Sequence, residues 1–162
     1  MKAPNTTFAY SPDHVDGPDV LLEYFDHPYN TTVLNERAIE IPIADHWLKS
    51  QGWPDQGPKG LEVGNVLWHY GYFGHKVVDL TETEGSSLFL ENIDVFDIDG
   101  EYDWILAIST LEHVYHDTPG PNGELDPNAA ARAVIHLYDL LKPGGEMLFT
   151  VPGGYHPTFD KW

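Results

Sequence analysis

The chain has 162 residues, no cysteine, and 26 acidic residues against 8 basic ones, which gives a formal net charge of −18. Its length fits a single domain of roughly 100–200 residues, no apolar run reaches the roughly 18 residues of a membrane-spanning helix, and the N-terminus lacks the basic-then-apolar order of a signal peptide. Negative charge repels nucleic-acid phosphates and anionic lipid, and the lack of cysteine excludes disulfides and thiolate metal sites. We therefore expect a soluble, cytoplasmic protein that has neither nucleic acid nor a membrane as a partner.

The excess of acidic residues admits two interpretations. A solvated acidic surface keeps a protein soluble in any compartment. The same surface suits a protein that works at high salt, because counterions screen the repulsion among its carboxylates.

The N-terminal third of the chain shows few regular patterns. Residues 1–32 combine turn-forming residues with scattered aromatic ones, so we expect an irregular arm or lid there. Residues 35–49 have apolar positions at roughly helical spacing, and we expect Pro42 to start or break that helix. The segment GWPDQGPKG (52–60) is a loop, which separates an N-terminal region (1–55) from a core (60–154) within one domain (1–162).

Short apolar runs alternate with longer segments after this loop. Residues 60–64 and 76–79 predict two strands, residues 87–90 or 93–95 a short third, and residues 102–108 a fourth that is apolar enough to be buried on both faces. Asp126 and Pro127 predict the cap and first residue of a helix that runs to Leu141, which Pro-Gly-Gly (143–145) stops before a fifth strand at 146–151. This alternation predicts an α/β fold with an open, mainly parallel sheet flanked by helices.

A glycine and two carboxylates follow the first three predicted strands. In an open α/β sheet a ligand binds beyond the carboxyl ends of the strands. Gly64 permits close approach of the backbone to a ligand, Asp79 can accept two hydrogen bonds from a ribose diol, and Asp94 can accept one from an exocyclic amine. Together they indicate a ligand site at this edge of the sheet.

At these positions the chain resembles the class I (Rossmann-like) S-adenosylmethionine-dependent methyltransferases. The resemblance covers about residues 60–154 and lies in LEVGN (61–65), VVD (77–79), NID (92–94), YDWILAISTLEHV (102–114) and LLKPGGEMLFTVP (140–152). The last two segments are the most specific, because Leu-Glu-His-Val after a buried strand, followed by Leu-Lys-Pro-Gly-Gly, is an uncommon combination. NERAIEIPIA (35–44) is similar to the N-terminal segment of a subgroup associated with surface-polysaccharide and other small-molecule pathways.

The resemblance implies an enzyme that transfers a methyl group from S-adenosyl-L-methionine to a small molecule, such as a sugar or another metabolite with a hydroxyl or amine, and releases S-adenosyl-L-homocysteine. It implies that the backbone at Gly64 passes the methionine moiety with Glu62 supporting this loop, that Asp79 binds the ribose, and that Asp94 contacts the adenine. The cofactor-binding residues that it implies are Glu62, Gly64, Asn65, Asp79, Ile93, Asp94, Ser109, Thr110 and Leu111.

The chain departs from the family pattern after Gly64. The family has further glycines two and four residues later, where this chain has Val66 and Trp68. A nicotinamide-dinucleotide enzyme would need G-x-G-x-x-G, and Val66 and His69 stand at its second and third glycines. The alternative that stays open is a non-catalytic or truncated S-adenosylmethionine-binding module that acts with a partner.

His113 and His116 follow the fourth predicted strand, where either is a candidate catalytic base for a hydroxyl acceptor. The alternatives are a structural role for His113 or a metal site that includes Asp117, and the small number of ligands leads us to expect no metal.

The aromatic residues in 68–73 line the cofactor pocket or, as we favour, form core over the sheet. Residues 117–127 are a substrate loop or a solvated excursion.

Methyltransferases of this class continue past the fifth strand with a helix and an antiparallel strand pair, whereas 11 residues follow Val151 here. The sheet would then expose an edge strand unless the N-terminal arm, a partner or a second copy covers it. We therefore expect a fragment of a longer enzyme, a homo-oligomer or a reduced domain.

Overall fold

The computed structural model describes residues 7–12, 18–30, 35–54, 59–83, 89–117 and 119–154. The chain divides into two compact units, Met1–Ser50 and Gln51–Trp162. The loop predicted at 52–60 begins next to this division, so the change in sequence pattern coincides with a change of structural unit.

The N-terminal unit contains a two-stranded antiparallel sheet and one helix. Strands β1 (Thr7–Tyr10) and β2 (Val20–Glu23) pair with Thr7 opposite Glu23 and Tyr10 opposite Val20. The irregular arm predicted over 1–32 is therefore wrong for these two segments. Each strand has only 4 residues, which is too short for an alternating pattern to stand out among the surrounding turn formers.

Helix α1 (Arg37–Ser50) confirms the helix predicted at 35–49 and accommodates Pro42 in its interior. A proline inside a helix leaves the carbonyl four residues earlier without its helical donor. That carbonyl belongs to Ala38, and it accepts a hydrogen bond of 2.9 Å from the backbone N–H of Phe25. The expectation that Pro42 starts or breaks the helix is wrong, because the segment after β2 replaces the lost bond.

The C-terminal unit is built on a five-stranded parallel sheet with the strand order β5-β4-β3-β6-β7. The chain adds two strands on one side of β3 and then crosses back to add β6 and β7 on the other. This arrangement confirms the predicted open parallel α/β sheet, is compatible with a Rossmann-like fold, and places the topological switch point between β3 and β6. The strands are β3 (Gly60–Val63), β4 (Lys76–Val78), β5 (Leu90–Glu91), β6 (Tyr102–Ile108) and β7 (Leu141–Thr150).

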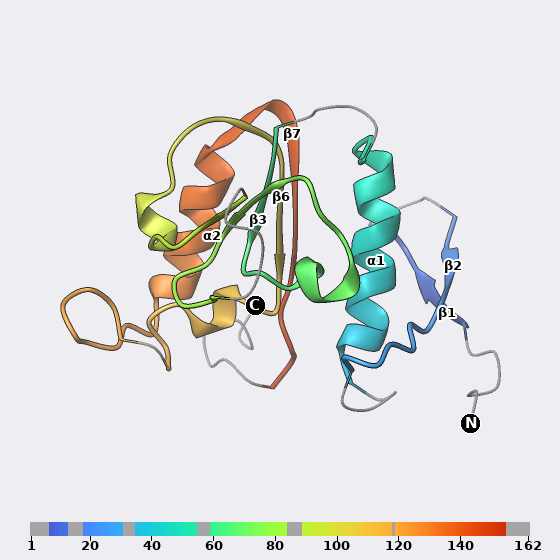
Figure 1. The fold of residues 1–162 in the computed structure, drawn as a ribbon, viewed down its shortest axis with the longest axis horizontal. Coiled ribbons are helices and arrows are strands. Elements are labelled where there is room, and N and C mark those ends of the chain that lie inside the picture. Colours follow the sequence, from blue (N-terminus) through green and yellow to red (C-terminus); the bar gives the residue numbers. More distant parts are fainter. Residues whose placement is uncertain are drawn as a thin grey trace. The chain divides into compact units, whose positions relative to one another are not determined.

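Helix α2 (Ala129–Asp139) covers one face of this sheet (Figure 1). Alternate residues of a strand point to opposite faces, and those of β3 and β6 that face α2 form one apolar cluster with Ala133 and Leu137. The intervening residues of the two strands are also buried, which confirms that the fourth predicted strand is covered on both faces. The cluster on the α2 side includes Leu61, Val63, Ile105 and Ala107, and the buried residues on the other side include Glu62, Trp104, Leu106 and Ile108.

The short third strand differs from both predicted alternatives. β5 comprises only Leu90–Glu91. The predicted segment 87–90 begins among residues that lie outside the described part of the chain, and Val95–Asp97 is a 3₁₀ helix, so the alternative at 93–95 is wrong.

The boundaries predicted around α2 are also wrong. Asp126 closes a turn ahead of the helix instead of capping it, because its Oδ1 accepts from the backbone N–H of Asn128 at 2.8 Å and its carbonyl accepts from that of Ala129 at 3.1 Å. The Pro-Gly-Gly segment does not stop the helix, which ends at Asp139, but lies within β7. Pairing there jumps from Tyr102 opposite Leu141 to Trp104 opposite Glu146, so the segment is a bulge.

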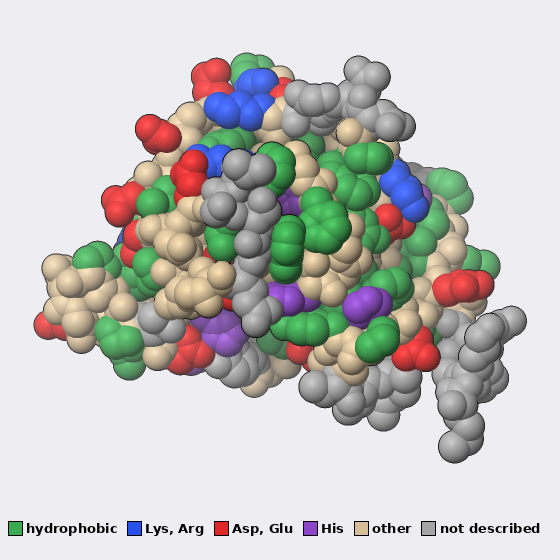
Figure 2. Space-filling view, viewed as in Figure 1, with side chains coloured by type: hydrophobic (Ala, Val, Ile, Leu, Met, Phe, Trp, Pro, Cys, Tyr) green, Lys and Arg blue, Asp and Glu red, His purple; other side chains and the backbone are tan. Residues whose placement is uncertain are grey.

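The surface carries acidic side chains, and β7 forms one edge of the five-stranded sheet. Asp and Glu side chains lie at several separate places on the face shown in Figure 2. Within the described residues, no helix is long and apolar enough to cross a membrane. Among the same residues β7 pairs on one side only, with β6, and no antiparallel strand joins this sheet.

Candidate functional site

Gly64 forms the turn at the carboxyl end of β3. Its φ is +87°, a conformation that favours glycine, and its N–H donates to Val78 O at 2.8 Å. A Cβ at this position would lie 2.1 Å from Oγ1 of Thr110, the second residue after β6. The turn therefore touches both neighbouring strand ends, and only glycine fits it.

Asp79 follows β4 and lies beside this turn. Its Oδ1 accepts from the backbone N–H groups of Thr81 at 2.9 Å and Glu82 at 2.8 Å, which uses that oxygen to close a turn. Among the described residues, its Oδ2 receives only a long contact of 3.4 Å from the N–H of Asn65. One oxygen thus shapes the loop, and the other keeps accepting capacity toward the end of β3.

The segment after β5 is tied to the loop that follows β4 and to the segment that follows β6. The Asn92 side chain donates to the carbonyl oxygens of Asp79 at 3.0 Å and Glu82 at 2.8 Å. Asp94 Oδ1 accepts from the N–H of Phe96 at 3.0 Å, and Asp94 Oδ2 accepts from the hydroxyl of Tyr115 at 2.7 Å. Burial and this hydrogen bond raise the pKa of Tyr115 to about 12. Both oxygens of Asp94 therefore already have donors.

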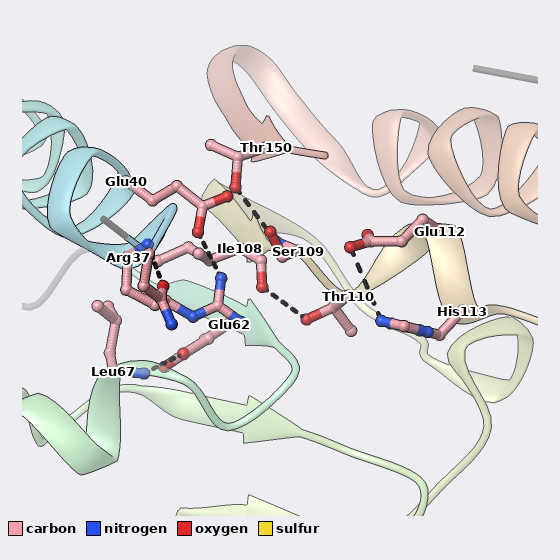
Figure 3. A network of polar contacts seen from close by, with 11 residues as sticks. Arg37, Glu40, Glu62, Leu67, Ile108, Ser109, Thr110, Glu112, His113 and Thr150 are labelled. Atoms are coloured by element: carbon pink, nitrogen blue, oxygen red, sulfur yellow. Dashed lines mark hydrogen bonds and ion pairs between the residues drawn. The ribbon is translucent and has the colours of Figure 1, made fainter. Parts of the chain in front are cut away.

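The end of β6 carries an unusual backbone conformation. Ser109 has a φ of +40°, and its N–H donates to Thr150 O at 3.0 Å and to Thr150 Oγ1 at 3.2 Å, the contact drawn in Figure 3. The hydroxyl of Thr110 donates to Ile108 O at 3.0 Å. Residues other than glycine with positive φ concentrate at functional sites, because such strain needs support from the surrounding structure.

Leu111 is fully buried in the apolar cluster under α2, as Ile93 is in part, so these two side chains contribute packing.

Glu62 is a buried carboxylate in the middle of the sheet. Its Oε1 accepts from the N–H of Leu67 at 2.8 Å, across the turn that contains Gly64 (Figure 3). Its Oε2 lies 2.6 Å from Nε2 of His75, which is also buried. Glu62 thus supports the turn at Gly64 directly.

The two candidate bases lie in the short segment after β6. The side chain of His113 is 46% exposed, with Nδ1 2.6 Å from Asp117 Oδ2 and Nε2 3.8 Å from Oε1 of the buried Glu112. His116 donates its backbone N–H to His113 O at 3.2 Å. A carboxylate at Nδ1 orients an imidazole ring and fixes its tautomer.

In the described residues, no group of three or more His, Asp and Glu side chains could hold a metal ion.

The aromatic residues after Gly64 divide between core and surface. Tyr70 is buried, whereas Trp68, Tyr72 and Phe73 line a shallow pocket together with Phe89 and other residues at the β4–β5 side of the sheet. This pocket shares only Asn65 with the cofactor residues expected from the sequence. The preference for core agrees with the buried Tyr70 and is wrong for Phe73, which is exposed, whereas Trp68 and Tyr72 are half-buried.

The structure brings Gly64, Asn65, Asp79 and Thr110 into direct contact at one edge of the sheet. Asp94 belongs to the neighbouring segment, which Asn92 ties to the Asp79 loop. Sequence reasoning did not assign roles to Asn92, Tyr115 or His75. Asn92 is within the quoted NID segment, but nothing in the sequence indicates that Tyr115 and His75 pair with acidic residues 21 and 13 positions away.

Comparisons with known proteins do not show a family for this chain. No family model matches it, and no solved structure matches it. Two catalase-peroxidases from Halobacterium salinarum, of strains R1 and NRC-1, are each 25% identical to it over 146 residues, which covers 83% of this chain and 20% of theirs. The chain thus spans about one fifth of the length of the curated relatives it matches. What the fold and the strand-end residues define is an α/β protein with a candidate ligand site at the switch point of a parallel sheet.

Proposed function

We propose that the chain binds S-adenosyl-L-methionine at the carboxyl edge of its sheet and transfers the methyl group to a small molecule. The observation that carries this proposal is the contact of the Gly64 turn with Asp79 on one side and Thr110 on the other, at the switch point between β3 and β6. Ligands of open α/β sheets bind at this place. The resemblance of the sequence segments to class I methyltransferases points to the same residues.

Each part of the cofactor has a candidate partner at this edge. The backbone at Gly64 and Asn65, with Ser109, Thr110 and the backbone of Leu111, would contact the methionyl moiety. Asp79 would accept from the ribose hydroxyls through Oδ2, the oxygen that the adjacent turn leaves accessible. Ile93 and Asp94 would contact the adenine, and Asp94 would do so alongside its bond from Tyr115. Glu62 would keep the turn in place through the N–H of Leu67.

The chemistry asks the protein mainly to position two reactants and to exclude water. When bound, S-adenosylmethionine supplies an electrophilic methyl group on a sulfonium. For a hydroxyl acceptor, His113 is the better placed of the two candidate bases, since Asp117 orients its ring from Nδ1. Excess negative charge disfavours anionic polymers as acceptors, and the subgroup that residues 35–44 resemble points to a small molecule.

Calorimetry with S-adenosylhomocysteine tests the cofactor site. Asp79→Asn keeps an oxygen for the N–H groups of Thr81 and Glu82 but removes the charge, so we expect the wild type to bind and the variant to bind at least about tenfold more weakly, as the loss of charge-assisted hydrogen bonds implies. Asp139→Asn is the matched control, because Asp139 is exposed at the end of α2. Equal affinity of the wild type and Asp79→Asn would remove the ribose assignment.

Turnover separates an enzyme from a binding module. We expect the wild type to form S-adenosylhomocysteine from S-adenosylmethionine when it is given panels of small hydroxyl or amine acceptors. Binding without turnover across such panels would favour the non-catalytic module.

A further inference from the structure

His75 is a buried histidine that the proposed function does not use. It comes directly before β4, its side chain is 3% exposed, and its Nε2 lies 2.6 Å from Oε2 of Glu62, whose side chain is 1% exposed. A buried carboxylate is costly unless it is paired and hydrogen-bonded. His75 therefore provides the partner that lets Glu62 remain inside the sheet.

The two oxygens of Glu62 point to different elements. Oε2 meets the imidazole of His75 in front of β4, and Oε1 accepts from the N–H of Leu67, the first residue of the 3₁₀ helix that follows the Gly64 turn. Because the two oxygens of a carboxylate belong to one rigid planar group, a bond that restrains one oxygen also restrains the direction in which the other accepts. His75 thus determines where the Leu67 N–H is held.

The imidazole itself is held by packing and by this one bond. Its ring centroid lies 5.6 Å from that of Trp104, which in turn lies so close to Gly60 that a Cβ there would be 2.0 Å from the indole. Nδ1 of His75 is buried and has no hydrogen-bond partner among the described residues. Among the described residues, Glu62 is therefore the hydrogen-bond partner that orients the imidazole ring.

We propose that His75 is a positioning residue for the Gly64 turn, residues 64–67. Through Glu62 it fixes the position of the Leu67 N–H and therefore the path of the backbone in this turn. The claim that this turn contacts S-adenosylmethionine rests on the proposed function. The claim that His75 orders the turn does not, and it is testable in the free protein.

Hydrogen exchange of the Leu67 amide provides that test. His75→Leu keeps the bulk but removes the donor, whereas His75→Gln places an amide N–H at a reach similar to that of Nε2. We expect exchange at Leu67 to be at least about tenfold faster in His75→Leu than in the wild type, and to return to within about threefold in His75→Gln. The amide of Ile105, in the middle of β6, is the internal reference for global unfolding. Equal acceleration at Leu67 and Ile105, or no recovery in His75→Gln, would show that His75 acts only in general packing.

Affinity for S-adenosylhomocysteine then links the turn to the cofactor. We expect His75→Leu to lose about tenfold or more in affinity and His75→Gln to recover most of it, in parallel with the exchange at Leu67. If the wild type does not bind S-adenosylhomocysteine, the proposed function fails while the exchange result still decides the role of His75. If His75→Leu does not fold, His75→Asn replaces it, because its shorter amide cannot reach the same point. Wild-type exchange at Leu67 in folded His75→Asn would then overturn the proposal.

Discussion

Replacing Gly64 by alanine tests the geometry of the strand-end site more directly than any other single change. Two separate penalties arise. Alanine at a φ of +87° is in the left-handed region, which costs about 1–2 kcal/mol. Its Cβ would also lie 2.1 Å from Oγ1 and 2.8 Å from Cγ2 of Thr110, and overpacking of this kind costs about 1–3 kcal/mol. We expect Gly64→Ala to lower the free energy of unfolding by about 2–5 kcal/mol.

Two further variants separate these penalties. Gly144→Ala is the matched control, because Gly144 has a φ of +82° and open space around its Cβ position, so only the conformational cost of about 1–2 kcal/mol applies. Thr110→Ala removes the two closest atoms but keeps the Thr110 Cβ at 2.9 Å, so it should relieve part of the overpacking cost of Gly64→Ala. The free energies come from urea unfolding followed by tryptophan fluorescence, and the interaction between Gly64 and Thr110 comes from the double-mutant cycle.

The cycle has a clear negative outcome. If Gly64→Ala costs no more than Gly144→Ala, or if Thr110→Ala does not reduce its cost, the end of β3 does not touch the end of β6 as described. The proposal of a shared ligand site at this edge would then lose its structural basis.

Two more predictions concern charge. The fold raises the pKa of Tyr115 from 10.0 to about 12, so it favours the neutral phenol: this stabilisation is complete below about pH 10 and is lost as the pH rises toward 12. The free energy of unfolding should therefore fall more steeply between about pH 9 and 11.5 in the wild type than in Tyr115→Phe, and identical slopes would contradict the partly buried bond to Asp94. Raising NaCl from about 0.1 to 1 M shortens the screening length from about 10 to 3 Å, which should weaken the self-repulsion of a chain with a net charge of −18 and raise its melting temperature. An unchanged or lower melting temperature would show that repulsion does not limit stability.

The strands of the parallel sheet were predictable where burial imposes a continuous apolar run. The strand at 102–108 agrees with β6 at both ends, because all but one of its residues are buried. Gly64 and Asp79 were predictable as neighbours, since residues that follow adjacent parallel strands meet at one edge. Their assignment to a cofactor remains a prediction.

Features that depend on long-range hydrogen bonds were not predictable. The partner that lets Pro42 lie inside α1 is the N–H of Phe25, and the bulge at 143–145 exists because β7 pairs with β6 on both sides of it. In the same way, the local sequence gives no sign that the hydroxyl of Tyr115 donates to Asp94 and occupies one of its oxygens. A sequence pattern gives the local preference of such residues but not the distant group that satisfies them.

The central position of β3 has a consequence for how the protein folds. β3 pairs with β6 across more than forty residues, with Leu61 opposite Ile105, and its pairing with β4 is also parallel, so neither of these described pairings is a local hairpin. Closing such a loop costs entropy before any contact compensates for it, so parallel pairings of this kind form slowly. The contact between Gly64 and Thr110 therefore forms only after the chain has been made beyond β6, and no fragment that ends before β6 can hold it.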